Sequence, residues 1–191
     1  MEKKIGFVDG IINKEFYKNS NVKILWILKE VNHDGDISDW DMTEILQNIK
    51  TEKGMEKGWE KTFGPIVYTT YGILKKKTWD EIPYYSDVPE IIDILKEIAY
   101  INVKKTAGNS TTHFSTLEKA YTENKTLLFD QINKINPSVI IYGGTYYLFE
   151  KDNEENMINK NIKHIDAYHP AQRQITHEKY CNNIIEEVNR I

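Results

Sequence analysis

Several polar residues of this chain have types that are suited to acid–base chemistry and to hydrogen bonding with a ligand. A glutamate such as Glu30 can orient water or stabilise positive charge, and a histidine such as His169 can donate a hydrogen bond to developing negative charge. The amide of Asn102 has one acceptor and two donors, so it can pair with an adjacent N–H and carbonyl. These residues lie in four short segments: KEVNHDGD (29–36), NVKKTAGNST (102–111), GGTYY (143–147) and YHPAQR (168–173).

Each polar segment lies at the end of an apolar run that has the length of a β-strand. Strand runs that are apolar on both faces and alternate with helices indicate a parallel sheet covered on both sides. We therefore expect an α/β protein, a three-layer α/β/α sandwich with a central, mostly parallel four-stranded sheet. The ligand site of such a sheet forms at the carboxyl ends of its strands. The expected strands are 22–28, 98–103, 138–144 and 162–168, and the expected helices are about 41–53, 58–74, 88–97, 116–135 and 176–190, the second bent or split at Gly64–Pro65.

Composition indicates one domain spanning residues 1–191, because 40% of the residues are hydrophobic and no compositional break divides the chain. The single cysteine, Cys181, excludes an internal disulfide and cannot by itself hold a zinc ion or an iron–sulfur cluster. We expect no leader, and the sequence contains no apolar run of about 18 residues that could span a bilayer. We expect a cytoplasmic monomer that does not enter a membrane. The net charge of −4 differs from the basic excess that is usual in proteins that bind nucleic acid.

With these residues the sequence resembles the uracil-DNA glycosylase superfamily over about residues 22–190. KEVNH (29–33) is similar in position to the first-strand loop of the GEAPG or GQDPY kind, and NVKKTAGN (102–109) is similar to the segment NVVKCRPPGN. His169 and Pro170 match the start of the HPS motif. The resemblance implies a uracil-DNA-glycosylase-like domain whose partner is single- or double-stranded DNA and which needs no cofactor. Its reaction would be hydrolysis of the N-glycosidic bond of uracil or another damaged or modified base after base flipping.

The resemblance and the chemistry of this reaction together suggest roles for nine residues. Bond cleavage leaves an oxocarbenium-like sugar and an anionic base, so a carboxylate or positioned water is needed on one side and a donor on the other. The expected catalytic residues are Glu30, Asn32 (an alternative to Glu30 for the same role) and His169. The base would contact Asn102, with Phe63, which the resemblance favours, or Tyr68 as an aromatic floor. Lys104, Lys105 and Arg173 would contact DNA phosphates.

The sequence departs from the superfamily at several positions. Ala171 replaces the serine of HPS, and in the absence of a leucine wedge Gln172 or Arg173 would fill the gap left by the flipped base. The four cysteines that some branches use for an iron–sulfur cluster are missing. These departures leave open which base is preferred.

Two classes of function follow. The first is a monofunctional glycosylase, favoured because no lysine is evident as a Schiff-base nucleophile at the strand ends. The second is a non-catalytic member of the same fold that binds nucleic acid, a nucleotide or a protein.

Two further sequence patterns raise the question of a metal site and of a phosphate site. The acidic stretch 33–41 does not have the spacing of an EF-hand, so we expect no metal site there. The Gly-Gly-Thr turn at 143–145 could bind phosphate at a helix start or be structural.

Overall fold

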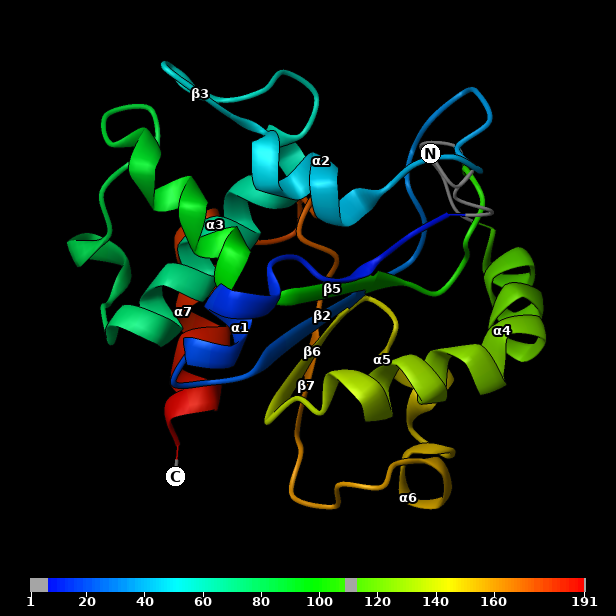
Figure 1. Cartoon of the computed structure of the whole chain (residues 1–191). Helices are drawn as coiled ribbons and strands as arrows, with labels where there is room; N and C mark the ends of the chain where they lie inside the picture. Colours follow the sequence, from blue (N-terminus) through cyan, green and yellow to red (C-terminus); the bar gives the residue numbers. More distant parts are fainter. Residues whose placement is uncertain (1–6, 109–112, 191) are drawn as a thin grey trace.

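A computed structural model describes residues 7–108 and 113–190, which form a mixed sheet with helices on both faces (Figure 1). Within these residues the main sheet has five strands in the order β1–β5–β2–β6–β7. The four predicted strands are present and parallel. The strands are β1 (Gly10–Ile11), β2 (Ile24–Leu28), β5 (Ala99–Asn102), β6 (Val139–Gly143) and β7 (Lys163–Ala167).

The expectation of a four-stranded sheet is wrong in one respect, because β1 adds a fifth strand at the edge. This strand pairs antiparallel with β5, with Gly10 opposite Tyr100 and Ile11 opposite Ala99. It is only two residues long and has no apolar run of its own, so periodicity could not reveal it.

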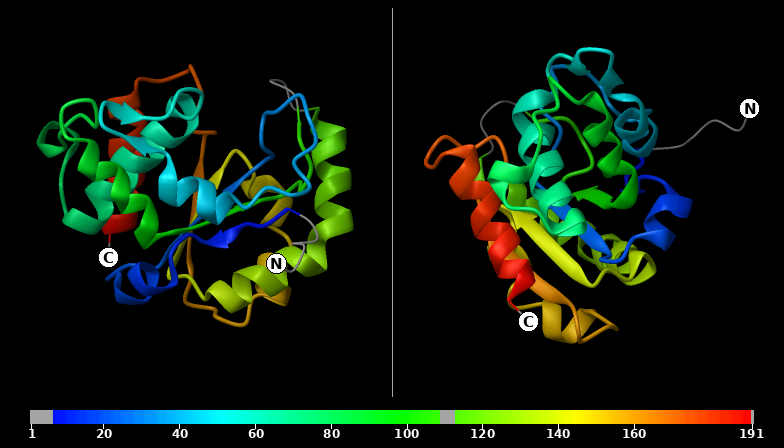
Figure 2. Two further views of the ribbon diagram at one scale, coloured as in Figure 1. Left: turned by 45° about the horizontal axis from the view of Figure 1, so that its top comes forward. Right: turned by 90° about the vertical axis from the view of Figure 1, so that its left-hand side faces the viewer.

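The buried strands divide their side chains between two cores because successive residues point to opposite faces. In β2, Trp26 and Leu28 enter one core, and Leu25 and Ile27 enter the other. The first core lies under α2 (Met42–Asn48), α3 (Glu60–Lys75), η2 (Pro89–Glu97) and α7 (His177–Asn189), whereas the second lies under α4 (Phe114–Ile135) and α5 (Tyr146–Phe149). Figures 1 and 2 show α3 and α7 on one side of the sheet and α4 on the other. The predicted three-layer arrangement is therefore confirmed.

Short elements complete the chain around this sandwich. They are α1 (Lys14–Asn19), the hairpin strands β3 (Lys50–Thr51) and β4 (Gly54–Met55), the 3₁₀ helix η1 (Trp79–Glu81) and α6 (Asn153–Asn156).

Two helices differ from the sequence expectation. α3 continues through Gly64 and Pro65 as one helix, so the predicted split is not found. The predicted helix at 88–97 is the 3₁₀ helix η2. Its buried residues form pairs three positions apart, Ile91 with Ile94 and Ile92 with Leu95, and this spacing fits a helix with three residues per turn.

The strand order places a topological switch point at β2. This strand has β5 on one side and β6 on the other, so the chain winds first in one direction and then in the other. Ligand sites in open α/β sheets form at the carboxyl ends of the strands beside such a point. The ends of β2, β5, β6 and β7 are therefore where a site is expected.

Candidate functional site

The segments that follow β2 and β5 run side by side beyond the sheet. The N–H of Lys104 donates to the carbonyl of Lys29 (2.9 Å), and the N–H of Gly108 donates to the carbonyl of Val31 (2.9 Å). His33 returns a bond to the Gly108 carbonyl (3.1 Å). These bonds extend the parallel pairing of the two strands, so residues 29–33 and 102–108 of two predicted polar segments lie together at one edge of the sheet. Residues 109–111 of the second predicted segment lie outside the described residues.

Glu30 lies against Gly108 in this pair of segments. A Cβ built on Gly108 would lie 2.3 Å from Cγ and 2.6 Å from Oε1 of Glu30, so only glycine leaves room for the glutamate in its present position. Glu30 is half-buried, whereas Asn32, its alternative for the same role, is exposed. The geometry thus holds Glu30 more firmly than Asn32 at the strand ends.

Asn102 is the last residue of β5 and is fully buried, with 0% of its surface exposed. Its backbone N–H donates to Oδ2 of Asp9 (2.8 Å). Neither polar atom of its side chain has a hydrogen-bond partner of normal geometry among the described residues. The amide is close enough to the Tyr100 hydroxyl to oppose the increase that burial causes in the pKa of this phenol. A buried amide without partners is costly, and such groups in native proteins call for an explanation.

Asp9 holds Asn102 in place and was not expected from the sequence. Its side chain is 1% exposed and accepts hydrogen bonds from Lys105 Nζ (2.7 and 2.8 Å) and from Gln131 Nε2 (2.9 Å), in addition to the bond from Asn102. Asp9 directly precedes the unpredicted strand β1, and nothing in the sequence near it indicates this role. It is a positioning residue at the end of β5.

Lys105 was predicted to contact DNA phosphate, but the structure gives it a structural partner. The side chain is 14% exposed, and burial lowers the pKa of its ammonium group while the Asp9 carboxylate opposes that change. The charge of Lys105 is thus compensated inside the protein. We do not retain a phosphate-binding role for it.

Replacing Asp9 by asparagine is expected to destabilise the fold by about 3–5 kcal/mol, because the buried Lys105 would lose its counter-charge. Chemical denaturation of wild type and variant measures the difference. Glu123→Gln is the matched control, since it removes an exposed ion pair with Lys119 and should leave stability unchanged. Equal stability of Asp9→Asn and wild type would show that the pair contributes nothing.

His169 follows β7 and is held as a neutral imidazole. Its Nδ1 accepts a hydrogen bond from the backbone N–H of Ala171 (3.2 Å), which leaves the ring hydrogen on Nε2. Burial, with a smaller contribution from the positive charge of Lys29, lowers the pKa of His169 to about 4. At neutral pH the ring is therefore a hydrogen-bond donor through Nε2.

The Gly143–Gly144 turn brings the ends of β2, β6 and β7 together. Gly144 has φ = +72°, and a Cβ there would lie 3.3 Å from Lys29 Cε and 3.4 Å from the His169 nitrogen. A Cβ on Gly143 would lie 2.2 Å from Leu28 Cδ2 and 3.1 Å from Pro170 Cδ. These contacts support the structural reading of the turn, since the glycines allow close approach of the other strand ends.

Gly144→Ala is expected to lower both stability, by about 1–2 kcal/mol, and the activity proposed below. The new methyl group would meet Lys29 and His169 in addition to straining the backbone. Gly58→Ala is a matched control, because Gly58 also has positive φ (101°) but has nothing within 4 Å of the added Cβ. Both variants strain the backbone, but only Gly144→Ala brings a methyl group against Lys29 and His169. Comparing the thermal denaturation and the activity of the two variants therefore separates the effect of this contact from that of strain. Equal effects would contradict this role of Gly144.

Phe63 lies in the core beside the end of β5. It is 2% exposed and packs against Trp59 (ring centroids 5.6 Å apart) and Tyr100 (5.4 Å). Tyr100 and Asn102 share a face of β5, so Phe63 lies on the side of the sheet that Asn102 faces. Trp40 and His33 continue this aromatic series toward the surface. Neither Trp40 nor Trp59 was expected from the sequence to lie near the site.

Among the described residues, we find no contact between Tyr68 and the ends of the strands. It stacks on Tyr85 (5.4 Å, 17°), meets Trp79 and Tyr84 edge-on, and is 8% exposed. Burial raises its pKa to about 12. These contacts give Tyr68 a packing role between α3 and the segment that follows η1.

The remaining predicted residues differ in whether their side chains form hydrogen bonds within the protein. Lys104 Nζ donates to the carbonyl of Ala107 (2.9 Å) within its own loop. Arg173 is exposed. Gln172 folds its own loop, because its side chain bonds to the backbone of Gln174 and Ile175. Of the two residues suggested to fill the gap left by a flipped base, Arg173 is the one whose side chain makes no such bond to the described residues.

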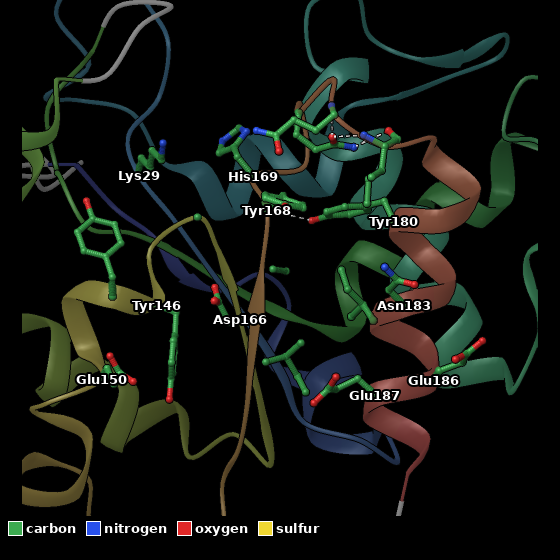
Figure 3. Close-up of a pocket in the computed structure, with 18 of the residues that line it drawn as sticks. Lys29, Tyr146, Glu150, Asp166, Tyr168, His169, Tyr180, Asn183, Glu186 and Glu187 are labelled. Atoms are coloured by element: carbon green, nitrogen blue, oxygen red, sulfur yellow. Dashed lines mark hydrogen bonds between the residues drawn. The ribbon is translucent and has the colours of Figure 1, made fainter.

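A groove of about 860 Å³ opens beside His169 along β7 (Figure 3). Lys29 and His169 line its upper end, but Asn102 and Glu30 are not among its lining residues. Lys29 was not predicted, although its position at the end of β2 could have indicated it. Its presence beside His169 weakens the sequence argument that no lysine is evident as a Schiff-base nucleophile at the strand ends.

Two aspartates of the acidic stretch 33–41 accept hydrogen bonds that stabilise the local structure. Asp41 caps α2 by accepting from the N–H groups of Thr43 and Glu44, and Asp36 accepts from Ser38. Across residues 7–108 and 113–190, no three His, Cys, Asp or Glu side chains gather as metal ligands would. Over the same ranges, none of the helices has both the length and the apolar character needed to cross a bilayer.

Comparison with known proteins gives no relative: no family model matches the chain, and neither a curated protein nor a solved structure matches it significantly. The resemblance to the uracil-DNA glycosylase superfamily therefore stays a prediction. Any functional proposal depends on the geometry of the strand ends.

Proposed function

We propose that this protein is a DNA glycosylase that hydrolyses the N-glycosidic bond of uracil or another modified base after flipping it out of the stack. The buried Asn102 amide, whose polar atoms have no hydrogen-bond partner of normal geometry among the described residues, is the observation that supports this best. A base edge with an adjacent carbonyl and N–H would satisfy both atoms. The binding of such an edge offsets the cost of keeping the amide unpaired.

Two further groups at the carboxyl ends of the strands have the chemistry that the reaction requires. As the bond between C1′ and the base nitrogen breaks, its electron pair moves to the base, and the Nε2–H of His169 donates a hydrogen bond to the resulting anion. Glu30 stabilises the oxocarbenium-like sugar and takes the proton of the water that adds to C1′. Asn32 is the alternative for orienting that water. Lys104 and Arg173 contact the DNA backbone.

The complete burial of Asn102 has a consequence for substrate entry. The flipped base must displace whatever covers the amide before it can pair with it. Phe63, close to Asn102 through Tyr100, then serves as the aromatic floor. We expect base binding to be coupled to a local rearrangement, as is common in enzymes that close around a substrate.

The test is single-turnover cleavage of labelled oligonucleotides that contain uracil, hypoxanthine or a modified cytosine, in single- and double-stranded form. Abasic-site formation that Asn102→Ala and His169→Ala both abolish would support the proposal and identify the base. Borohydride trapping in the same reactions tests Lys29, because a covalent enzyme–DNA adduct that is lost in Lys29→Met would indicate a Schiff base. Absence of base release from every substrate at high enzyme and low salt would contradict the proposal.

A non-catalytic nucleotide- or nucleic-acid-binding protein is the second candidate. The observation that favours it is that the groove beside His169 does not include Asn102 or Glu30, together with the net charge of −4. Such a protein would retard the same oligonucleotides in a binding assay and leave them intact. The glycosylase would produce abasic sites under these conditions.

A further inference from the structure

On the outer edge of β7, main-chain N–H and carbonyl groups make no hydrogen bonds with another strand of the described residues. The N–H of Lys163 donates to Ser138 (2.9 Å), and the carbonyl of Ala167 accepts from Gly144 (2.7 Å), so alternate residues from 163 to 167 face β6. The intervening residues, His164 and Asp166, direct their N–H and carbonyl groups away from the sheet. In residues 7–108 and 113–190 we find no hydrogen bond to these four groups.

A groove gives access to this edge (Figure 3). It is the groove of about 860 Å³ described above, and residues 165–168 of the β7 segment are among those that line it. Glu150, at the end of α5, lies on one side, and Glu186 and Glu187 of α7 lie on the other (Figure 3). Asp166 lies between them, whereas His169 is at the upper end (Figure 3). The groove therefore has a strand edge as its floor and a helix on each side.

The lining of this groove is acidic. It holds four carboxylates, from Glu150, Asp166, Glu186 and Glu187, against the two cations Lys29 and Arg190. Arg190 pairs with Glu186 (3.5 Å). Burial, and after it the negative charge of Glu150, raises the pKa of Asp166. A positively charged occupant would relieve this repulsion.

Lys163 does not neutralise the groove, although it belongs to β7. Its ammonium group donates to the carbonyls of Glu187 and Arg190 near the end of α7. The strand therefore offers to the groove main-chain N–H and carbonyl groups that are unpaired among the described residues, while the ammonium group of Lys163 is bound to the end of α7.

We propose that the outer edge of β7 binds an extended, lysine- or arginine-rich segment of a partner protein, which adds to the sheet as a further strand. The main-chain groups of His164 and Asp166 would give the pairing, and the carboxylates on both sides would select a basic sequence. The five residues of β7 span about 17 Å, enough to pair with a segment of similar length. A second copy of this chain is a poor partner, because its own β7 edge brings the same carboxylates. This inference does not depend on the proposed glycosylase activity.

Binding of designed peptides tests the proposal on the full chain. An eight-residue peptide of alternating lysine and valine, labelled for fluorescence anisotropy, is expected to bind at least about tenfold more tightly than its glutamate–valine counterpart, and more weakly as salt rises. Equal binding of the two peptides, or binding of neither, would overturn the proposal. The carboxylates would then only protect an exposed sheet edge against aggregation.

Two substitutions at one position separate main-chain pairing from charge. Asp166→Ala removes the carboxylate and keeps the outward N–H, whereas Asp166→Pro removes both at a site where an edge strand tolerates proline. We expect Asp166→Pro to bind the lysine–valine peptide about three- to tenfold more weakly than Asp166→Ala, the effect of one lost hydrogen bond. Equal affinities of the two variants would contradict strand addition.

Amide hydrogen exchange of the wild type provides a readout that does not require the proline variant to fold. The peptide is expected to slow exchange at His164 and Asp166 at least about tenfold and to leave Gln172, outside the strand, unchanged. Glu150→Lys should weaken this protection. Unchanged exchange at His164 and Asp166 with saturating peptide would overturn the proposal.

Discussion

Asn102→Ala is expected to lower the single-turnover rate of base release by about 100-fold or more without lowering the stability of the fold. The amide makes no hydrogen bond of normal geometry within the described protein, so its removal costs only the weak interaction with the Tyr100 hydroxyl. In the substrate complex the same change removes the donors and the acceptor that read the base. Rate constants and denaturation midpoints of the same preparations measure the two effects.

Asn124→Ala is the matched control for this result. The side chain of Asn124 donates to the carbonyl of Val103 (3.1 Å), next to Asn102, so its loss should lower stability and spare the rate. The reverse pattern would contradict the proposed role. If Asn102→Ala were clearly less stable than wild type but released base at the wild-type rate, Asn102 would be a structural residue.

The second large effect concerns His169. His169→Ala is expected to reduce base release by about 100-fold, because the neutral ring donates through Nε2 to the departing base. The wild-type rate should show no ionisation of a histidine between pH 5.5 and 8, since the pKa of His169 is lowered to about 4. Nitrogen chemical shifts from NMR report the tautomer directly and should indicate the Nε2–H form throughout this range.

The lowered pKa also predicts how stability depends on pH. In the unfolded chain the imidazole takes up a proton below its ordinary pKa of 6.5, whereas in the folded protein it stays neutral down to about 4. Stability should therefore fall as the pH decreases from 6.5 to 4, by up to about 3 kcal/mol. The pH dependence of stability should be shallower in His169→Ala than in the wild type. A pKa near 6.5 in the NMR titration of His169 would contradict the buried, neutral ring.

The amino-acid sequence by itself determined the four parallel strands of the main sheet and the residues at their carboxyl ends, but not β1. Runs such as ILWIL in β2 are apolar at every position because both faces of a parallel sheet are buried, so composition alone reveals them. Glu30 and Asn102 follow or end such runs, and His169 follows the more mixed run of β7. Parallel strands bring their carboxyl ends to one edge. Their location at the same edge of the sheet could thus be predicted before the structure was known, although the groove beside His169 includes neither Glu30 nor Asn102.

The local environment of each side chain was decided only by the tertiary structure. Lys104 and Lys105 are equivalent in the sequence, yet Lys105 pairs with Asp9, which is 96 positions away and lies beside a two-residue strand. Tyr68 and Phe63 lie on one helix, and only Phe63 packs near the end of β5. Burial, ion pairing and the tautomer of His169 depend on contacts between distant segments. Periodicity in the sequence reports which face of an element is buried, but it does not report which distant groups meet there.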